Sequence, residues 1–138
     1  MGTTTFLGAA ILNEVFRATN YAPPSTVYVS LHTADPGDNG ANEVTVGAFP
    51  AYAREDAAQG GAATAAWGAP SSNQISNLLE LLWEIHNGAG AITVTHFGLW
   101  DAASGGNCLY TGAVTASKTL NVGDQFVIRV GDLDVSVA

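Results

Sequence analysis

Residues 92–115, ITVTHFGLWDAASGGNCLYTGAVT, predict an antiparallel β-hairpin. Residues 92–100 are rich in β-branched and aromatic side chains, and residues 108–115 run back as the second strand. Between them, Asp101 to Gly106 provide the small and polar residues that hairpin loops use, and Asp101 is expected to cap this turn with its own side chain. The chain therefore contains at least one pair of adjacent antiparallel strands.

Further short strands extend this pattern in both directions along the chain. Residues 27–32, 125–130 and 133–137 alternate apolar and other side chains with a period of two. Shorter strands are expected near 52–56 and 63–67. Many short strands with turn signals between them favour a mainly β fold, an antiparallel β-sandwich or jelly-roll-like domain with one N-terminal α-helix.

The helix is expected over residues 6–18, and two prolines a few positions later end its pattern. The apolar residues that recur at helical spacing are Leu7, Ile11, Leu12 and Val15. We expect this stripe to pack against the protein's own sheet, in preference to docking on a partner. Residues 74–85 favour a strand, although the leucine-rich segment 78–86 also fits a helical turn or two.

The chain has 138 residues, a length that suits one domain. We expect a single domain over residues 1–138, with the N-terminal helix in 1–22 and the β-sandwich in 23–138. Residues 1–21 have no basic segment of the kind that opens a signal peptide, so synthesis in the cytoplasm without secretion is expected.

Charged residues make up only 12% of the sequence, and the net charge is −8. Its cations are too few and too dispersed to form the basic footprint that nucleic acid or an anionic membrane needs. No apolar run approaches the length of a membrane span. We therefore expect no nucleic-acid partner and no membrane partner. The cations are Arg17, Arg54, Lys118 and Arg129.

The residue types that carry chemistry do not form a recognisable active site or metal site. His32, His86 and His96 lack the close spacing of a zinc motif, and Cys108 is the only cysteine. Ser104 is not surrounded by the GxSxG pattern of a hydrolase. We expect a non-enzymatic protein with no cofactor and no metal, and a buried, inert thiol at Cys108.

The segment 33–47 is long, rich in turn-forming residues and without a clear core residue. Its oxygen-bearing side chains do not follow the register of a calcium loop and are typical of tight turns. We expect this loop to be exposed, and it is the best candidate for an interface. The candidate interface residues are Asp35, Pro36, Asp38, Asn39, Asn42 and Glu43.

Several strings follow one another in a fixed order: VYVSLHTADPGDNGANEV, AYARE, NQISN, THFGLWDAASGGNCLYTG, ASKTLNVGDQFVI and GDLDVSV. Each string alone is a strand flanked by turn signals, whereas their shared order covers almost the whole chain. In this order they resemble a family of small structural proteins of tailed bacteriophages and prophages. The resemblance implies a virion structural protein, of tail-fibre-like or capsid-decoration type, with no catalytic residues to transfer. The segment LLELLWEIHNGAG is longer than the family pattern at that point.

The leading prediction is a capsid decoration or cement protein that binds the major capsid protein and bridges capsid subunits. Small size, few charges and the lack of a fibrous repeat favour this function. One alternative is a tail or baseplate accessory protein bound to tail proteins. Another is a host-glycan-binding module built on Trp67, Trp83 and Trp100, although core packing is expected for most aromatic residues. In a virion role, we expect a homo-oligomer or a component present in many copies.

Overall fold

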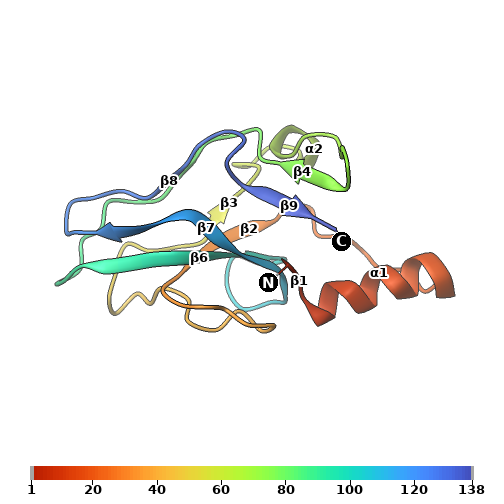
Figure 1. The fold of residues 1–138 in the computed structure, drawn as a ribbon, viewed down its shortest axis with the longest axis horizontal. Coiled ribbons are helices and arrows are strands. Elements are labelled where there is room, and N and C mark those ends of the chain that lie inside the picture. Colours follow the sequence, from red (N-terminus) through yellow and green to blue (C-terminus); the bar gives the residue numbers. More distant parts are fainter. Residues whose placement is uncertain (1, 138) are drawn as a thin grey trace.

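The computed structural model describes residues 2–137, and its main element is a five-stranded antiparallel sheet (Figure 1). Each strand of this sheet is hydrogen-bonded to its neighbours in an order that differs from the order along the chain. That order is β1 (Gly2–Thr3), β7 (Cys108–Leu120), β6 (Ile92–Trp100), β2 (Tyr28–His32) and β3 (Glu55–Asp56).

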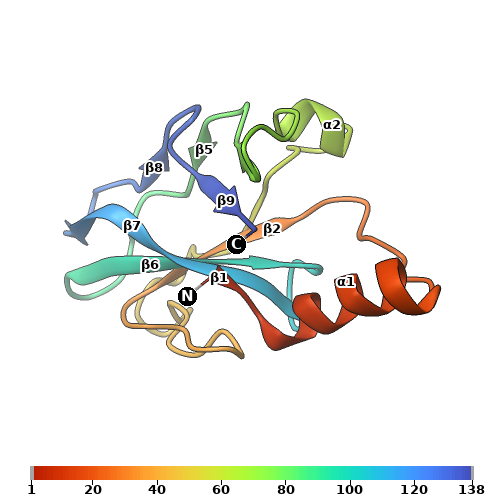
Figure 2. The ribbon, with the colours of Figure 1, turned by 45° about the vertical axis from the view of Figure 1, so that its right-hand side comes forward.

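A second layer covers one face of the main sheet and consists of two short antiparallel ladders (Figures 1 and 2). One ladder pairs β4 (Gln74–Ser76) with β9 (Asp134–Ser136), and the other pairs β5 (Leu81–Leu82) with β8 (Val127–Ile128). Apolar side chains from both layers form a single buried core, which includes Val29, Leu31, Val94 and Leu120 from the main sheet and Leu81, Trp83, Phe126, Ile128 and Leu133 from the second layer. The prediction of a mainly β, antiparallel, sandwich-like fold with one N-terminal helix is confirmed.

The hairpin predicted from 92–115 is formed by β6 and β7. The first strand has the predicted bounds, and the second runs to Leu120, five residues further than its composition indicated, because Ile92 pairs with Leu120 at the far end of the ladder. A register irregularity lies between Val94 and His96. Such an irregularity increases the local twist of a sheet.

The segments between the predicted strands differ in part from expectation. Residues 63–67, predicted as a strand, begin with the short helix α2 (Ala63–Ala66), because the segment is rich in alanine, the residue with the highest helix propensity. The strand favoured for 74–85 is confirmed at β4 and β5, with irregular backbone between them and no helix within 78–86. Within residues 2–137, neither helix has the length and apolar character that crossing a membrane requires.

Helix α1 (Thr5–Arg17) has the predicted position, but its expected packing against the sheet is wrong. The Thr4 hydroxyl accepts a hydrogen bond from the Leu7 amide and caps its start, and the helix ends at Ala18 in the left-handed region. None of residues 5–17 is buried. The helix projects from the end of the main sheet, beyond the layer that covers the core (Figures 1 and 2). Its apolar residues therefore remain largely exposed to solvent.

Candidate functional site: a buried polar junction

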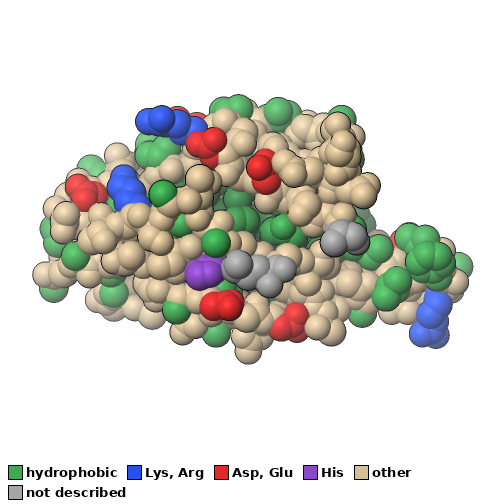
Figure 3. Space-filling view, viewed as in Figure 1, with side chains coloured by type: hydrophobic (Ala, Val, Ile, Leu, Met, Phe, Trp, Pro, Cys, Tyr) green, Lys and Arg blue, Asp and Glu red, His purple; other side chains and the backbone are tan. Residues whose placement is uncertain are grey.

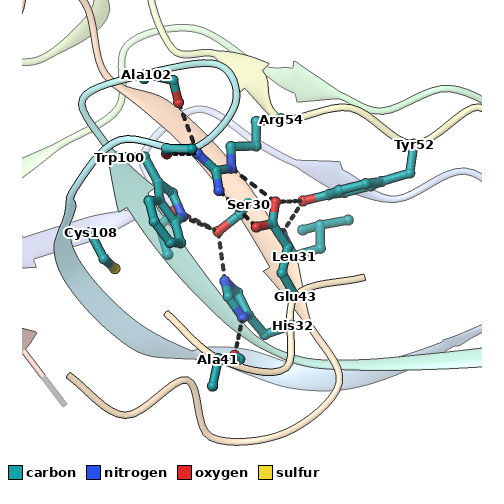
Figure 4. Close-up of polar contacts among 12 residues, drawn as sticks. Ser30, Leu31, His32, Ala41, Glu43, Tyr52, Arg54, Trp100, Ala102 and Cys108 are labelled. Atoms are coloured by element: carbon teal, nitrogen blue, oxygen red, sulfur yellow. Dashed lines mark hydrogen bonds and ion pairs between the residues drawn. The ribbon is translucent and has the colours of Figure 1, made fainter. Parts of the chain in front are cut away.

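The most elaborate arrangement of polar side chains lies where loop 33–54 meets the end of β6 (Figure 4). We call this cluster the polar junction. It combines residues from β2, from the loop and from β6: Ser30, His32, Glu43, Tyr52, Arg54 and Trp100.

Arg54 is the centre of the polar junction and its side chain is only 8% exposed. Its Nε and Nη2 atoms donate to the two carboxylate oxygens of Glu43 at 2.9 and 2.8 Å. Its Nη1 atom donates to the carbonyls of Ala102 and Gly105 at 3.0 and 2.9 Å, and the guanidinium lies 3.7 Å from the centroid of the Trp100 ring. A single guanidinium thus connects the 33–54 loop to the β6–β7 hairpin, using the planar donor fork that a lysine lacks.

Glu43 is held as a carboxylate by two side chains. Burial acts to raise the pKa of Glu43, but hydrogen bonds from Arg54 and Tyr52 outweigh it, so that the pKa lies below its usual value. The Tyr52 hydroxyl donates to Glu43 at 2.8 Å and accepts from the Leu31 amide at 3.1 Å. Burial, together with the charge of Glu43, raises the pKa of Tyr52, so this hydroxyl stays protonated and continues to donate.

A second chain of hydrogen bonds passes through Ser30 and His32. Trp100 Nε1 donates to Ser30 Oγ at 2.8 Å, Ser30 Oγ lies 2.6 Å from His32 Nε2, and His32 Nδ1 lies 2.7 Å from the Ala41 carbonyl. Because a carbonyl only accepts, Nδ1 carries the proton of the neutral imidazole and Nε2 accepts from Ser30. This chain fixes Ala41, and with it the loop, to the main sheet.

A Ser–His pair at this distance has the geometry of an activated nucleophile. Here, however, both side chains are 0% exposed, and His32 is oriented by a backbone carbonyl rather than by a carboxylate. Gly98 packs against the pair so closely that an added Cβ would lie 2.7 Å from Ser30 Oγ. No substrate atom can reach Ser30 without opening the sheet, so the arrangement serves to hold the loop.

His32 makes the stability of the fold depend on pH. Burial lowers the pKa of His32 below its usual value of 6.5. As the pH falls below 6.5, the unfolded chain takes up this proton before the folded chain does, so the free energy of unfolding decreases toward acid. We expect His32→Asn, which keeps a donor for Ala41 but cannot titrate, to flatten this decrease in urea titrations at pH values below 6.5. An unchanged pH dependence in this variant would show that other groups cause it.

The 33–42 loop carries most of the residues predicted as an interface, and the structure anchors it more firmly than expected. Asp35 accepts from the Gly37 amide, Asn42 donates to the Asp35 carbonyl, and Asp38 accepts from the Thr5 amide at the start of α1 at 2.6 Å. Pro36 is fully buried. The expectation that the segment lacks core residues is therefore wrong.

The predicted interface residues fall into two groups. Asp35, Asp38, Asn39 and Asn42 lie exposed on the loop. Pro36 and Glu43 point inward and hold the loop in place, Pro36 by packing and Glu43 through the polar junction.

Of the other histidines, His86 lies outside the polar junction, whereas His96 is the cross-strand partner of His32 in the β2–β6 ladder. His86 is buried, 2.6 Å from the Gly90 carbonyl and packed on Phe49, while His96 contacts Thr95. Across residues 2–137, no three His, Cys, Asp or Glu side chains are grouped in a way that would hold a metal ion.

Asp101 caps the hairpin turn as predicted. Its carboxylate accepts from the Asn107 amide at 2.7 Å and from the Asn107 side chain at 2.9 Å. Gly106 has a φ of 72°, and a Cβ there would lie 2.4 Å from the Asp101 carboxylate. The turn therefore requires glycine both for its backbone conformation and for space.

Cys108 is buried, as predicted, and burial raises the pKa of its thiol to about 11. We expect a thiol reagent at about pH 8 to label the folded protein at least roughly 100-fold more slowly than the protein in denaturant. Equal labelling rates in both conditions would show that the hairpin around Cys108 opens readily.

Sequence reasoning did not find the polar junction, although the strings that carried the family resemblance meet there. Arg54 and Tyr52 come from AYARE, His32 and Glu43 from the string before it, and Ala102 from DAASGG. One signal in the sequence points to it: Arg54 is the only lysine or arginine between Arg17 and Lys118. Trp83 and Trp100 are buried and Trp67 is partly buried, which confirms core packing for most tryptophans.

A family model described as Podophage GP4 fiber I protein gp80 matches residues 2–136. No curated protein matches the chain. Since the family model covers nearly the whole sequence, the chain belongs to the podophage GP4 fiber I protein gp80 family and is a structural protein of the bacteriophage virion.

Proposed function

We propose that this protein is a non-enzymatic virion subunit that binds a neighbouring virion protein through loop 33–42. The observation that carries the proposal is that this loop is exposed at its tip and fixed at its base. His32 and Arg54 hold it through Ala41 and Glu43. A loop that is already ordered binds without the entropic cost of ordering, so its affinity is higher.

The rest of the molecule is consistent with binding rather than catalysis. Ser30, His32 and Cys108, the side chains best suited to chemistry, are buried. Because only 12% of the residues are charged, few ions have to leave water when the surface meets a partner. We also propose that residues 2–137 fold as one domain around the single core.

Two positions on the particle have support. The family description favours attachment to the tail as part of a fibre. Capsid decoration, with the major capsid protein as partner, is supported by the small low-charge body. Many copies of such a body on a symmetric lattice would gain affinity, because their modest contacts add as avidity. Host-glycan binding has less support, because two of the three tryptophans that would form a stacking platform are buried.

The proposal is tested by Asn39→Arg, with Val130→Arg as the matched control on the second layer. Both positions are exposed, so the parent fold should be kept. Binding to phage particles made without the protein should weaken roughly tenfold for Asn39→Arg, equivalent to about 1.4 kcal/mol, and stay unchanged for the control. Equal binding by both variants would show that loop 33–42 is not the binding surface. A parent protein that binds no virion component would overturn the proposed function.

A further inference from the structure

Helix α1 exposes an apolar surface that the other residues of the described range 2–137 leave uncovered. Phe16 is 77% exposed and Val15 is 65% exposed, and hydrophobic side chains gather over this end of the molecule (Figure 3). A helix of 13 residues is marginally stable alone in water, and most helical stability comes from packing an apolar face. The other large apolar side chains exposed on it are Phe6, Ile11 and Leu12.

Two copies of this surface fit together when their helices run antiparallel, because large residues of one helix then meet small residues of the other. Positions 8, 9, 12, 15 and 16 lie on one helix face because they are spaced by about one turn. In a pair centred on Leu12, Phe16 of one copy faces Gly8 of the other, and Val15 faces Ala9. The bulky end of each helix thus meets the small residues of the other.

A groove is present where the bulky end would insert. It has a volume of about 460 Å³ and lies between the Gly8 side of α1 and the C-terminal strand, bordered by Ile11, Leu12, Tyr110 and Val137. A Cβ built on Gly8 would meet only one side-chain atom, at 4.0 Å.

Charges favour the antiparallel arrangement over a parallel one. Arg17 lies in the last turn of α1, whereas the Asp38 carboxylate lies at its first turn, bound to the Thr5 amide. Antiparallel pairing brings Arg17 of each copy toward Asp38 of the other and places opposite helix dipole ends together. Parallel pairing would bring the two Arg17 side chains together.

The side chains on the pairing face supply most of the area of a specific contact. Leu12, Val15 and Phe16 on this face, with Ile11 at the groove, expose on the order of 100 Å² each, or on the order of 800 Å² over two copies, and the groove wall at Tyr110 and Val137 adds to it, which approaches the lower bound of about 1,000 Å² for a stable interface. We propose that two copies of this chain associate through antiparallel α1 helices, with Phe16 of each inserted beside Gly8 of the other. This surface meets loop 33–42 only at Asp38, so Phe16→Gln tests the pairing and Asn39→Arg tests the proposed function, and either can fail without the other.

The test is the molar mass of the full chain by light scattering over a dilution series. The parent should be a dimer, and Phe16→Gln should weaken the dimer on the order of 100-fold, because it removes the central anchor while keeping a good helix former. Val130→Gln, another exposed apolar residue, is the control and should leave the dimer intact. Unchanged circular dichroism shows that each variant remains folded. A monomeric or trimeric parent, or a Phe16→Gln variant that dimerises like the parent, would overturn the proposal.

Orientation is tested by cross-linking in the same protein. Ala9→Cys and Val15→Cys variants are mixed and oxidised, while Cys108 stays buried. Antiparallel pairing predicts that mixed dimers form much faster than dimers of either variant alone. Faster cross-linking of each variant with itself would contradict the antiparallel arrangement.

Discussion

Arg54→Ala is expected to lower the free energy of unfolding by about 3–5 kcal/mol, since it removes one partner of a largely buried ion pair. The variant leaves the partly buried carboxylate of Glu43 without a cation, and it leaves the carbonyls of Ala102 and Gly105 without the Arg54 donor. An uncompensated charge in this environment costs more than the lost contact itself. Equilibrium unfolding in guanidinium chloride measures the difference.

Two controls separate geometry from charge in this experiment. Arg54→Lys keeps the charge but cannot donate to Glu43 and to both carbonyls at once, so it should remain clearly destabilised. Arg129→Ala removes a cation from an exposed position and should change stability by less than about 0.5 kcal/mol. A loss below about 1 kcal/mol for Arg54→Ala would mean that the polar junction does not hold the loop.

Gly40→Ala is expected to be the most damaging small substitution in the loop. The residue has a φ of 73°, and a Cβ there would lie 2.2 Å from the Trp100 ring. That ring cannot move freely, because it contacts the Arg54 guanidinium and donates to Ser30. Left-handed strain of about 1–2 kcal/mol and overpacking of about 1–3 kcal/mol should therefore add in the measured unfolding free energy.

Gly37→Ala is the matched control for this substitution. Gly37 has a similar φ of 61°, but a Cβ there would meet nothing within 4 Å. It should show the backbone strain alone, so the difference between the two variants reports the contact with Trp100. Equal destabilisation by both would contradict the packing of the loop on β6.

The elements that sequence predicted well are those whose signals are local. The bounds of β6 follow from β-branched and aromatic residues followed by the DAASGG turn. The extent of α1 follows from helical periodicity before the two prolines.

The features that sequence did not predict depend on contacts between distant parts of the chain. Arg54 meets Glu43 across 11 positions and Ala102 across 48, and no periodicity encodes such pairs. The amphipathic stripe of α1 is real, but a stripe does not say whether the chain's own core or another molecule covers it. Loop 33–42 was identified as exposed from its turn residues, whereas the burial of Pro36 depends on the sheet beside it.

A three-dimensional reconstruction of the assembled phage particle tests the central claim most directly. We expect density that fits residues 2–137 on the particle, with loop 33–42 against a neighbouring virion protein and α1 against a second copy. Position on the tail would support the fibre role, and position on the capsid lattice would support decoration. Purified, infectious particles that contain no copy of the chain, by density and by mass spectrometry, would contradict the assignment as a virion structural protein.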